Sequence, residues 1–205
     1  LRSVSNMKLK LWILFLMLAG FCVAQDWPMY RADPQRTAYS NSIAPQHPDI
    51  LWTWCCEESF WDAPPTTYDN MLFIGSTCYG GIIGGNIYAF NKWNGTLLWH
   101  RELNRSVMGT EVWSGKIYMN NGNPQLRVLN FNGDELWNLS LAPDSHGIPL
   151  VYDGQVLAPN VDNERCYAIN ATTGEVIWNV SLGFCRIIGL VPTKNLLMVE
   201  DRVHD

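Results

Sequence analysis

The stretch IYAFNKWNGTLLWH, residues 87–100, decides the fold, because related segments follow it twice, as LRVLNFNGDELWN and YAINATTGEVIWN. All three share an Asn, a Gly and a Trp four residues after the Gly. The equivalent positions are Ala89, Asn91, Gly95 and Trp99, then Val128, Asn130, Gly133 and Trp137, then Ala168, Asn170, Gly174 and Trp178. The tryptophans are 38 and 41 residues apart, a period typical of stacked supersecondary units.

Each copy predicts a β-hairpin, because an apolar run precedes a turn of Asn, Asp, Thr and Gly and a second run ends at the Trp. The second copy is one residue shorter between Val128 and Gly133, so we expect a tighter turn there. Earlier turns are predicted at Asp69-Asn70, Ser114-Gly115, Asp153-Gly154 and Lys194-Asn195. Four short strands per unit, without helical periodicity, predict an all-β propeller of four-stranded antiparallel blades.

The repeat resembles that of the pyrroloquinoline-quinone-like (PQQ-like) β-propellers, with Tyr-Ala, an Asn or Asp, a Thr-Gly or Asn-Gly turn and the Trp. This family includes quinoprotein dehydrogenases and the propeller lipoprotein of the bacterial outer-membrane assembly machinery. The resemblance runs from about Asp26 to the end of the chain. It implies that each Trp docks against the neighbouring blade over the small Ala and Gly, and Val128 departs from that pattern.

The beginning of the chain predicts export. The six residues before Met7 suggest no structure, and we interpret them as read-through from upstream of the start. Two lysines then precede the apolar run 11–23, which is too short to span a bilayer comfortably, and Ala24 precedes polar residues. We therefore expect a secretory signal within 1–24 and a mature chain without a transmembrane span, in the periplasm, at the cell surface or outside the cell. Lipidation at Cys22 and an uncleaved anchor are the alternatives.

Three segments are predicted along the chain. They are residues 1–24 with the signal, 25–49 as an N-terminal strap, and 50–205 as a partial propeller with blades at about 55–101, 102–139 and 140–180 and the start of a fourth at 183–205. The sequence DWPMYRADPQRTAYS, residues 26–40, resembles the lead-in of many such propellers, and we expect it to lie across the blades. ILWTW, residues 50–54, fits the last strand of a blade, with Trp52 as its repeat Trp. The propeller is expected to be incomplete, since closed propellers have about four to eight blades.

The charge of the mature chain argues against nucleic-acid binding. Without residues 1–24 it has 11 basic and 19 acidic residues, a net charge of −8, and no cluster of Lys or Arg. Acidic side chains repel phosphates, so we expect no nucleic-acid partner. The remaining 181 residues suffice for one domain with a sizeable core.

Five cysteines follow the signal, namely Cys55, Cys56, Cys78, Cys166 and Cys185. In an exported protein we expect pairing, although the odd number leaves one cysteine free or paired outside this sequence. One bridge would join a member of the adjacent pair to Cys78, and another would join Cys166 to Cys185 between blades. The resemblance offers a further reading, because some quinoprotein dehydrogenases place a disulfide between adjacent cysteines against their cofactor.

No catalytic constellation is predicted. The histidines form no triad pattern and the acidic residues are scattered, so no acid and base pair can be named. His146, in the loop PDSHG, lies where propellers present ligand contacts, but an ordinary loop role is preferred. Candidate N-glycosylation sites, of the form Asn-x-Ser/Thr, are Asn94, Asn104, Asn138, Asn170 and Asn179.

The leading functional hypothesis is an exported, non-catalytic propeller that binds a protein partner and needs no metal or cofactor. The resemblance implies a rival, a quinoprotein dehydrogenase with PQQ and calcium over the propeller axis. A third hypothesis is a surface module that binds glycans through exposed aromatic residues such as Trp61, Trp93 and Trp113.

Overall fold

A computed structural model describes residues 25–42, 46–47, 49–55, 63–76, 85–103, 105–121, 125–141, 147–160, 164–181, 185–191 and 196–201. These residues form strands and no helix, which confirms the predicted all-β class. Within the same ranges, no helix is long and apolar enough to cross a membrane.

The described strands form three four-stranded antiparallel sheets, called blades 1 to 3, and one two-stranded sheet. Blade 1 contains β1 (Thr66–Tyr68), β2 (Met71–Gly75), β3 (Asn86–Asn91) and β4 (Leu97–Glu102). Blade 2 contains β5 (Gly109–Trp113), β6 (Lys116–Asn120), β7 (Gln125–Asn130) and β8 (Glu135–Ser140). Blade 3 contains β9 (Leu150–Tyr152), β10 (Gln155–Asn160), β11 (Arg165–Asn170) and β12 (Val176–Ser181). The two-stranded sheet pairs β13 (Cys185–Val191) with β14 (Leu196–Asp201).

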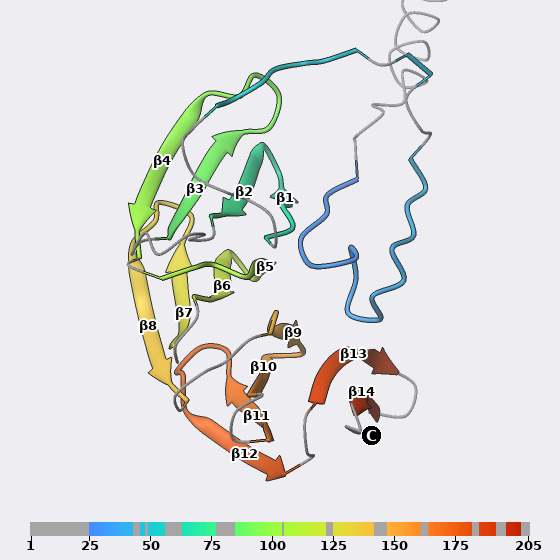
Figure 1. The fold of residues 1–205 in the computed structure, drawn as a ribbon, viewed down its shortest axis with the longest axis vertical. Coiled ribbons are helices and arrows are strands. Elements are labelled where there is room, and N and C mark those ends of the chain that lie inside the picture. Colours follow the sequence, from blue (N-terminus) through green and yellow to red (C-terminus); the bar gives the residue numbers. More distant parts are fainter. Residues whose placement is uncertain are drawn as a thin grey trace, which may run out of the picture.

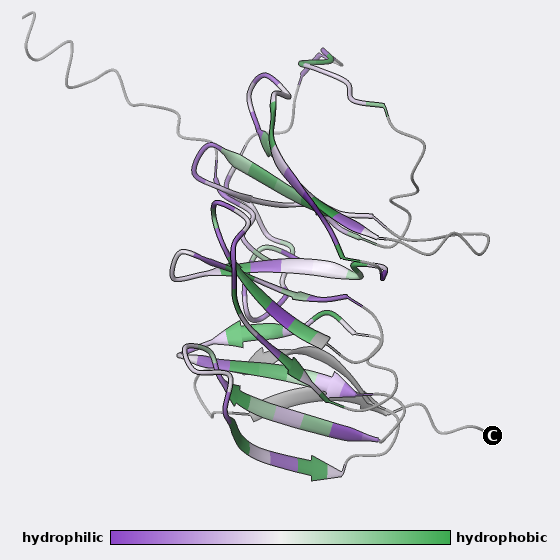
Figure 2. Cartoon of the chain, turned by 90° about the vertical axis from the view of Figure 1, so that its left-hand side faces the viewer, coloured by the Kyte–Doolittle hydropathy of each residue, from purple (hydrophilic) through white to green (hydrophobic). Residues whose placement is uncertain are grey.

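The blades follow one another along an arc (Figure 1). The last strands, β4, β8 and β12, lie on its convex outer side, and the first strands, β1, β5 and β9, lie on its concave inner side. Strand β5 contacts both β1 and β9, so the inner strands of consecutive blades are neighbours. Hydrophobic stretches lie within the strands (Figure 2), as sheets packed against sheets require. The arrangement is an incomplete propeller, as predicted.

The described turns have the chemistry that the sequence predicts, and the predicted turn at Lys194-Asn195 lies outside the described residues. Asp69 has a φ of 52°, and Ser114-Gly115 and Asp153-Gly154 have positive φ at both residues. Between the third and fourth strands, the side-chain oxygen of each repeat Asn accepts the N–H two residues later. The Gly133 N–H donates to the carbonyl of the repeat Asn three residues before it. The N–H groups of Gly95 and Gly174 donate to the carbonyl of the repeat Asn four residues before them. The second copy therefore has the tighter turn.

Two apolar cores lie between adjacent blades. The first contains Phe73, Ile87, Ala89 and Leu103 from blade 1 and the segment that follows it, and Val107, Val112, Ile117, Met119 and Leu129 from blade 2 and the segment before it. The second contains Tyr118, Leu126, Val128 and Leu141, and Val151, Val156, Ala158, Ile169 and Ala171. Neighbouring blades therefore share each core, so burial of apolar area stabilises their contact more than either blade alone.

The repeat tryptophans pack on the glycine of the next blade. A Cβ placed on Gly95 would lie 2.6 Å from the indole of Trp52. The corresponding distances are 3.0 Å from Gly133 to Trp99 and 2.9 Å from Gly174 to Trp137. These glycines also have φ between 71° and 85°. Glycine is thus required twice at each position, because a side chain would clash with the indole and would strain the backbone.

Two details differ from the expectation. Ala89 pairs with Trp99 in the same blade and Ala168 pairs with Trp178, so the small Ala lies opposite its own Trp, and only the Gly belongs to the next blade. The described residues 49–55 form no strand, although Trp52 docks on blade 1, because none of the described strands pairs with them.

The indole N–H groups are satisfied differently at the docked tryptophans. Trp99 Nε1 donates to the Phe131 carbonyl at 2.7 Å. The equivalent carbonyl in blade 3, that of Ala171, instead accepts from the Tyr118 hydroxyl at 3.0 Å. Trp137 Nε1 is buried without a hydrogen-bond acceptor among the described residues.

This difference gives a testable prediction for phenylalanine substitutions. Trp99→Phe leaves the Phe131 carbonyl without its donor, whereas Trp137→Phe removes an N–H that has no acceptor. An unmade hydrogen bond of a buried group costs about 1 to 3 kcal/mol, so Trp99→Phe should be more destabilising by roughly 1 to 2 kcal/mol. Urea unfolding measures both variants, and equal losses would contradict the hydrogen-bond assignment.

Candidate functional site

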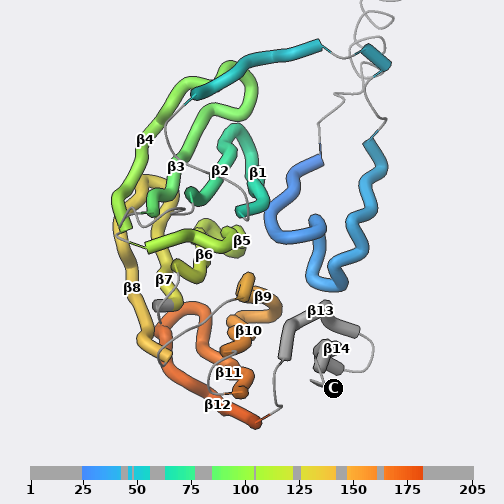
Figure 3. Tube along the Cα trace, in the orientation of Figure 1, coloured from blue at the N-terminus to red at the C-terminus, as the bar shows by residue number. Residues whose placement is uncertain are grey.

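The N-terminal strap, residues 25–42, lies on the concave inner side of the blades (Figure 3). Trp27 forms an antiparallel bridge with Thr67 of β1, in which its carbonyl accepts the Thr67 N–H at 2.8 Å. One residue further on, the Pro28 carbonyl accepts the Val112 N–H of β5 at 2.6 Å. The strap thus bonds to the inner strands of blades 1 and 2.

The start of the strap is also tied to blade 1 through a carboxylate. Asp26 Oδ1 pairs with Lys92 Nζ at 2.8 Å, and Asp26 Oδ2 accepts the Asp69 N–H at 2.9 Å. Both partners belong to turns of blade 1. The strap therefore begins at a fixed point on this blade.

Arg36 connects the strap to blades 2 and 3. Its Nη2 lies 3.4 Å from Glu111 Oε1 in β5 and donates to the carbonyls of Ile148 and Pro149, just before β9, at 3.3 and 3.4 Å. The other oxygen, Glu111 Oε2, accepts the Val151 N–H of β9 at 2.8 Å. The exposed fractions of the Arg36 and Glu111 side chains are 5% and 0%. This buried ion pair joins the strap to the inner strands of blades 2 and 3.

The strap backbone takes a conformation that L-residues rarely adopt. Arg31, Ala32, Arg36 and Ala38 have φ of 60°, 72°, 55° and 57°. Residues in this region cost about 1 to 3 kcal/mol each and persist only where the surroundings hold them. The bridge at β1 and the ion pair at β5 supply that restraint on either side.

Burial controls the protonation of this pair. Desolvation raises the pKa of Glu111 from 4.5 to about 8, because it outweighs the opposing effects of Arg36 and the Val151 N–H. Desolvation likewise lowers the pKa of Arg36. Neither group is exposed to a dissolved substrate. The arrangement can therefore hold the strap but offers no accessible acid or base.

The raised pKa predicts how stability depends on pH. The folded protein keeps the Glu111 proton in a range where the unfolded chain has lost it. The contribution of this group to stability is therefore fully present below pH 4.5 and is lost as the pH rises through about 8. Urea midpoints across that range should fall with pH more steeply for the native chain than for Glu111→Gln. Identical slopes would contradict the shifted pKa.

The described inner edge does not fit a calcium ion. Calcium takes about six to eight oxygen ligands. The carboxylate at the centre of this edge, Glu111, already uses both oxygens for Arg36 and Val151. No three His, Cys, Asp or Glu side chains come together among the described residues. We therefore derive no chemistry through such a group.

The predicted cysteines are only partly placed. Cys55 is an exposed free thiol, so it forms neither a bridge to Cys78 nor one to its neighbour Cys56. Cys56 and Cys78 themselves lie outside the described residues. Cys166 is buried in β11, and Cys185 begins β13. A bridge between these two, or one from Cys56 to Cys78, stays a prediction.

Of the aromatic residues proposed for glycan binding, the structure describes Trp93 and Trp113. Trp113 packs against the core between blades 2 and 3. Trp93 is 51% exposed, but its Nε1 donates to Asn70 Oδ1 at 2.9 Å and Lys92 lies over its ring. Trp61, like His146 and Asn104, lies outside the described residues.

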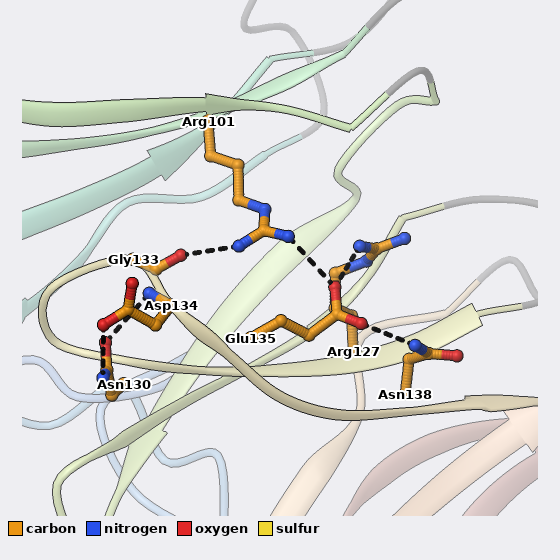
Figure 4. A network of polar contacts seen from close by, with 7 residues as sticks. All are labelled: Arg101, Arg127, Asn130, Gly133, Asp134, Glu135 and Asn138. Atoms are coloured by element: carbon orange, nitrogen blue, oxygen red, sulfur yellow. Dashed lines mark hydrogen bonds and ion pairs between the residues drawn. The ribbon is translucent and has the colours of Figure 1, made fainter.

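A second polar cluster links blades 1 and 2 on the outer side (Figure 4). Arg101 of β4 donates to the Gly133 carbonyl at 2.9 Å and lies 3.4 Å from Glu135 in β8. Arg127 of β7 also pairs with Glu135, and Asn138 donates to it. The residue equivalent to Arg101 in blade 2 is Leu139, which packs against the second core. The two contacts between blades thus differ in chemistry.

Sequence reasoning missed Glu111, the residue that anchors the strap. Its signal was present in the strand GTEVW, where one carboxylate stands among uncharged residues. A buried acid needs a partner, and that partner is 75 residues away in the chain. Nothing local in the sequence identifies Arg36 as that partner.

Three four-stranded blades with shared cores define this chain as an incomplete β-propeller. A family model described as "Outer membrane protein assembly factor BamB" matches residues 83–203, more than half of the chain. The chain belongs to this family of PQQ-like β-propellers. A comparison with curated proteins gives no match.

Solved structures with the same fold include BamB from Moraxella catarrhalis, at 20% identity and a TM-score of 0.55, with 74% of this chain and 45% of that one covered. A europium-containing methanol dehydrogenase has 20% identity and a TM-score of 0.62, with coverages of 76% and 32%. Quinohemoprotein alcohol dehydrogenase from Comamonas testosteroni has 21% identity and a TM-score of 0.63, with coverages of 76% and 27%. The chain spans less than half the length of each, and at these identities the likeness shows the fold alone.

Proposed function

We propose that this chain is an exported, non-catalytic PQQ-like propeller that serves as a protein-binding scaffold. The observation that carries the proposal is the family match, because an assembly factor works by contact with other proteins. The buried Arg36–Glu111 pair supports it, because the polar group at the centre of the inner edge holds the strap. Binding by repeat surfaces also needs no reactive constellation.

The beginning of the sequence supports export. The two lysines, the apolar run 11–23 and Ala24 form a secretory signal, and the strap begins directly after it. Asp26 and Trp27, the second and third residues after the proposed cut, already bond to blade 1. Cleavage after Ala24 would therefore leave the strap whole. Expressed from Met7, the secreted protein should begin at Gln25.

The proposal predicts how the protein behaves with the quinone. After incubation with PQQ and Ca²⁺, the purified chain should elute from gel filtration without the quinone, and it should not reduce a dye with alcohols or sugars. Stoichiometric retention by the native chain would favour the dehydrogenase hypothesis instead.

A further inference from the structure

Each outer strand carries a β-bulge that turns one aliphatic residue to solvent. The register shifts between Ala89 and Phe90, and at the same place in the other two blades, so one residue of each outer strand has no partner. These residues are Leu98, Leu136 and Ile177, which are 47%, 46% and 51% exposed. A bulge re-aims a side chain and keeps an edge strand from pairing with another chain. The outer rim therefore presents one aliphatic residue at the same position in every blade.

Two of the five glycosylation motifs follow these bulges directly. In β8, Leu136, Asn138 and Ser140 are exposed, and the residues between them are less exposed. In β12, the equivalent residues are Ile177, Asn179 and Ser181, and they are exposed, as is every residue of that strand. Alternate residues of a strand lie on the same face. Each motif therefore places its acceptor Asn on the solvent side, next to the exposed aliphatic residue.

Blade 1 has the same bulge without the motif. The positions equivalent to Asn138 and Ser140 are His100 and Glu102. His100 stacks on Tyr88, with ring centroids 5.8 Å apart. Blade 1 is thus an internal comparison, with an exposed aliphatic residue at Leu98 and no acceptor beside it.

The motifs in the turns are placed differently. The side-chain oxygen of Asn170 accepts the N–H groups of Thr172 and Thr173 at 2.8 and 3.0 Å. Asn94 accepts the Thr96 N–H at 3.0 Å. Both amides are therefore part of a turn. In contrast, Asn138 and Asn179 make exposed side-chain contacts, with Glu135 and Arg165, that no turn depends on.

We propose that Asn138 and Asn179 carry N-linked glycans, and that the first sugar of each lies over the neighbouring bulge residue. In the host's transfer reaction, the anomeric carbon of a lipid-linked oligosaccharide bonds to Nδ2, that nitrogen loses one proton, and the lipid pyrophosphate leaves. One N–H remains on Nδ2, so Asn138 can still donate to Glu135. The carbon-bound hydrogens of the sugar ring shield Leu136 and Ile177 from water, which is favourable for apolar surface.

The proposal rests on export, because the glycan donor lies in the secretory compartment. It goes beyond the scaffold function by dividing the outer rim into two parts. Glycans would cover the rim of blades 2 and 3, so a protein partner would find an uncovered outer strand at blade 1. The exposed aliphatic residues would then be protected from self-association, which exposed apolar surface promotes.

The test expresses the chain in a host that N-glycosylates exported proteins, both from Met7 and with residues 7–24 replaced by a host secretion signal. Amidase treatment converts each glycosylated Asn to Asp, which peptide mass spectrometry reads site by site. We expect Asp at 138 and 179, none at 170, and loss of both glycans in Asn138→Gln/Asn179→Gln. Unmodified Asn138 and Asn179 in secreted protein would overturn the proposal.

A second measurement tests the contact with the bulge. The double Gln variant should self-associate more than the glycosylated protein in light scattering, and adding Leu136→Ser and Ile177→Ser should reverse this. Scattering that is unchanged without glycans would overturn the shielding role. Failure of secretion from Met7 alone, with normal secretion behind the host signal, would count against the proposed export while leaving occupancy measurable.

Discussion

Replacing Trp99 with Ala should lower the free energy of unfolding by about 3 to 5 kcal/mol, the range for large aromatic residues in a core. The indole packs on Gly133 of the next blade and against the core that blades 1 and 2 share. Burial of about 150 to 250 Å² at 25 cal/mol per Å² gives an upper value of roughly 4 to 6 kcal/mol. Because domains are stable by only about 5 to 15 kcal/mol, the loss would approach unfolding.

Two other tryptophans are controls for this result. Trp93 is 51% exposed in a turn, so Trp93→Ala should change stability by about half a kcal/mol, with a small addition for its bond to Asn70. Trp178 is a repeat Trp, and the sequence alone predicts the same cost there as at Trp137. In the structure it is 40% exposed. Urea unfolding should therefore give Trp178→Ala a smaller loss than Trp99→Ala, and equal losses at Trp93 and Trp99 would refute the docking role.

Arg36→Met should destabilise the chain by about 1 to 3 kcal/mol at neutral pH, because Glu111, whose raised pKa of about 8 keeps it largely protonated there, loses the donor to one of its buried oxygens. Glu111 is fully buried, and the remaining donor would be the Val151 N–H. The strap would also lose its bonds to Ile148 and Pro149. Limited proteolysis within residues 25–42 should accelerate with the loss of stability, since the strained strap would no longer be held.

The double variant Arg36→Met/Glu111→Leu separates the cost of the unpaired carboxyl from the cost of the lost bonds between the strap and blade 3. Replacing a buried ion pair with apolar residues is often neutral or stabilising by about 1 to 4 kcal/mol, so much of the loss should be recovered. A double variant as unstable as Arg36→Met would mean that the carboxyl is not what makes the single change costly. Arg31→Met, on the same strap, is the matched control and should have an effect within about half a kcal/mol.

Much of the fold could be predicted because its determinants are local. The positive φ at Gly95, Gly133 and Gly174 and the side-chain bonds of the repeat Asn depend on residues within one turn. Three copies of that turn at one period imply blades. The site could not be predicted in the same way, because Arg36 and Glu111 are joined only when the strap crosses the blades.

The sequence by itself determined the repeat, the four strands of each blade, the tight second turn and the family, since hydrophobic pattern and turn chemistry act over a few residues. Only the tertiary structure decided that the glycine receives the Trp of the preceding blade. It also decided that Glu111 anchors the strap. The physical reason is that burial and charge pairing depend on which surfaces meet, and residues far apart in the chain meet only after the blades have packed.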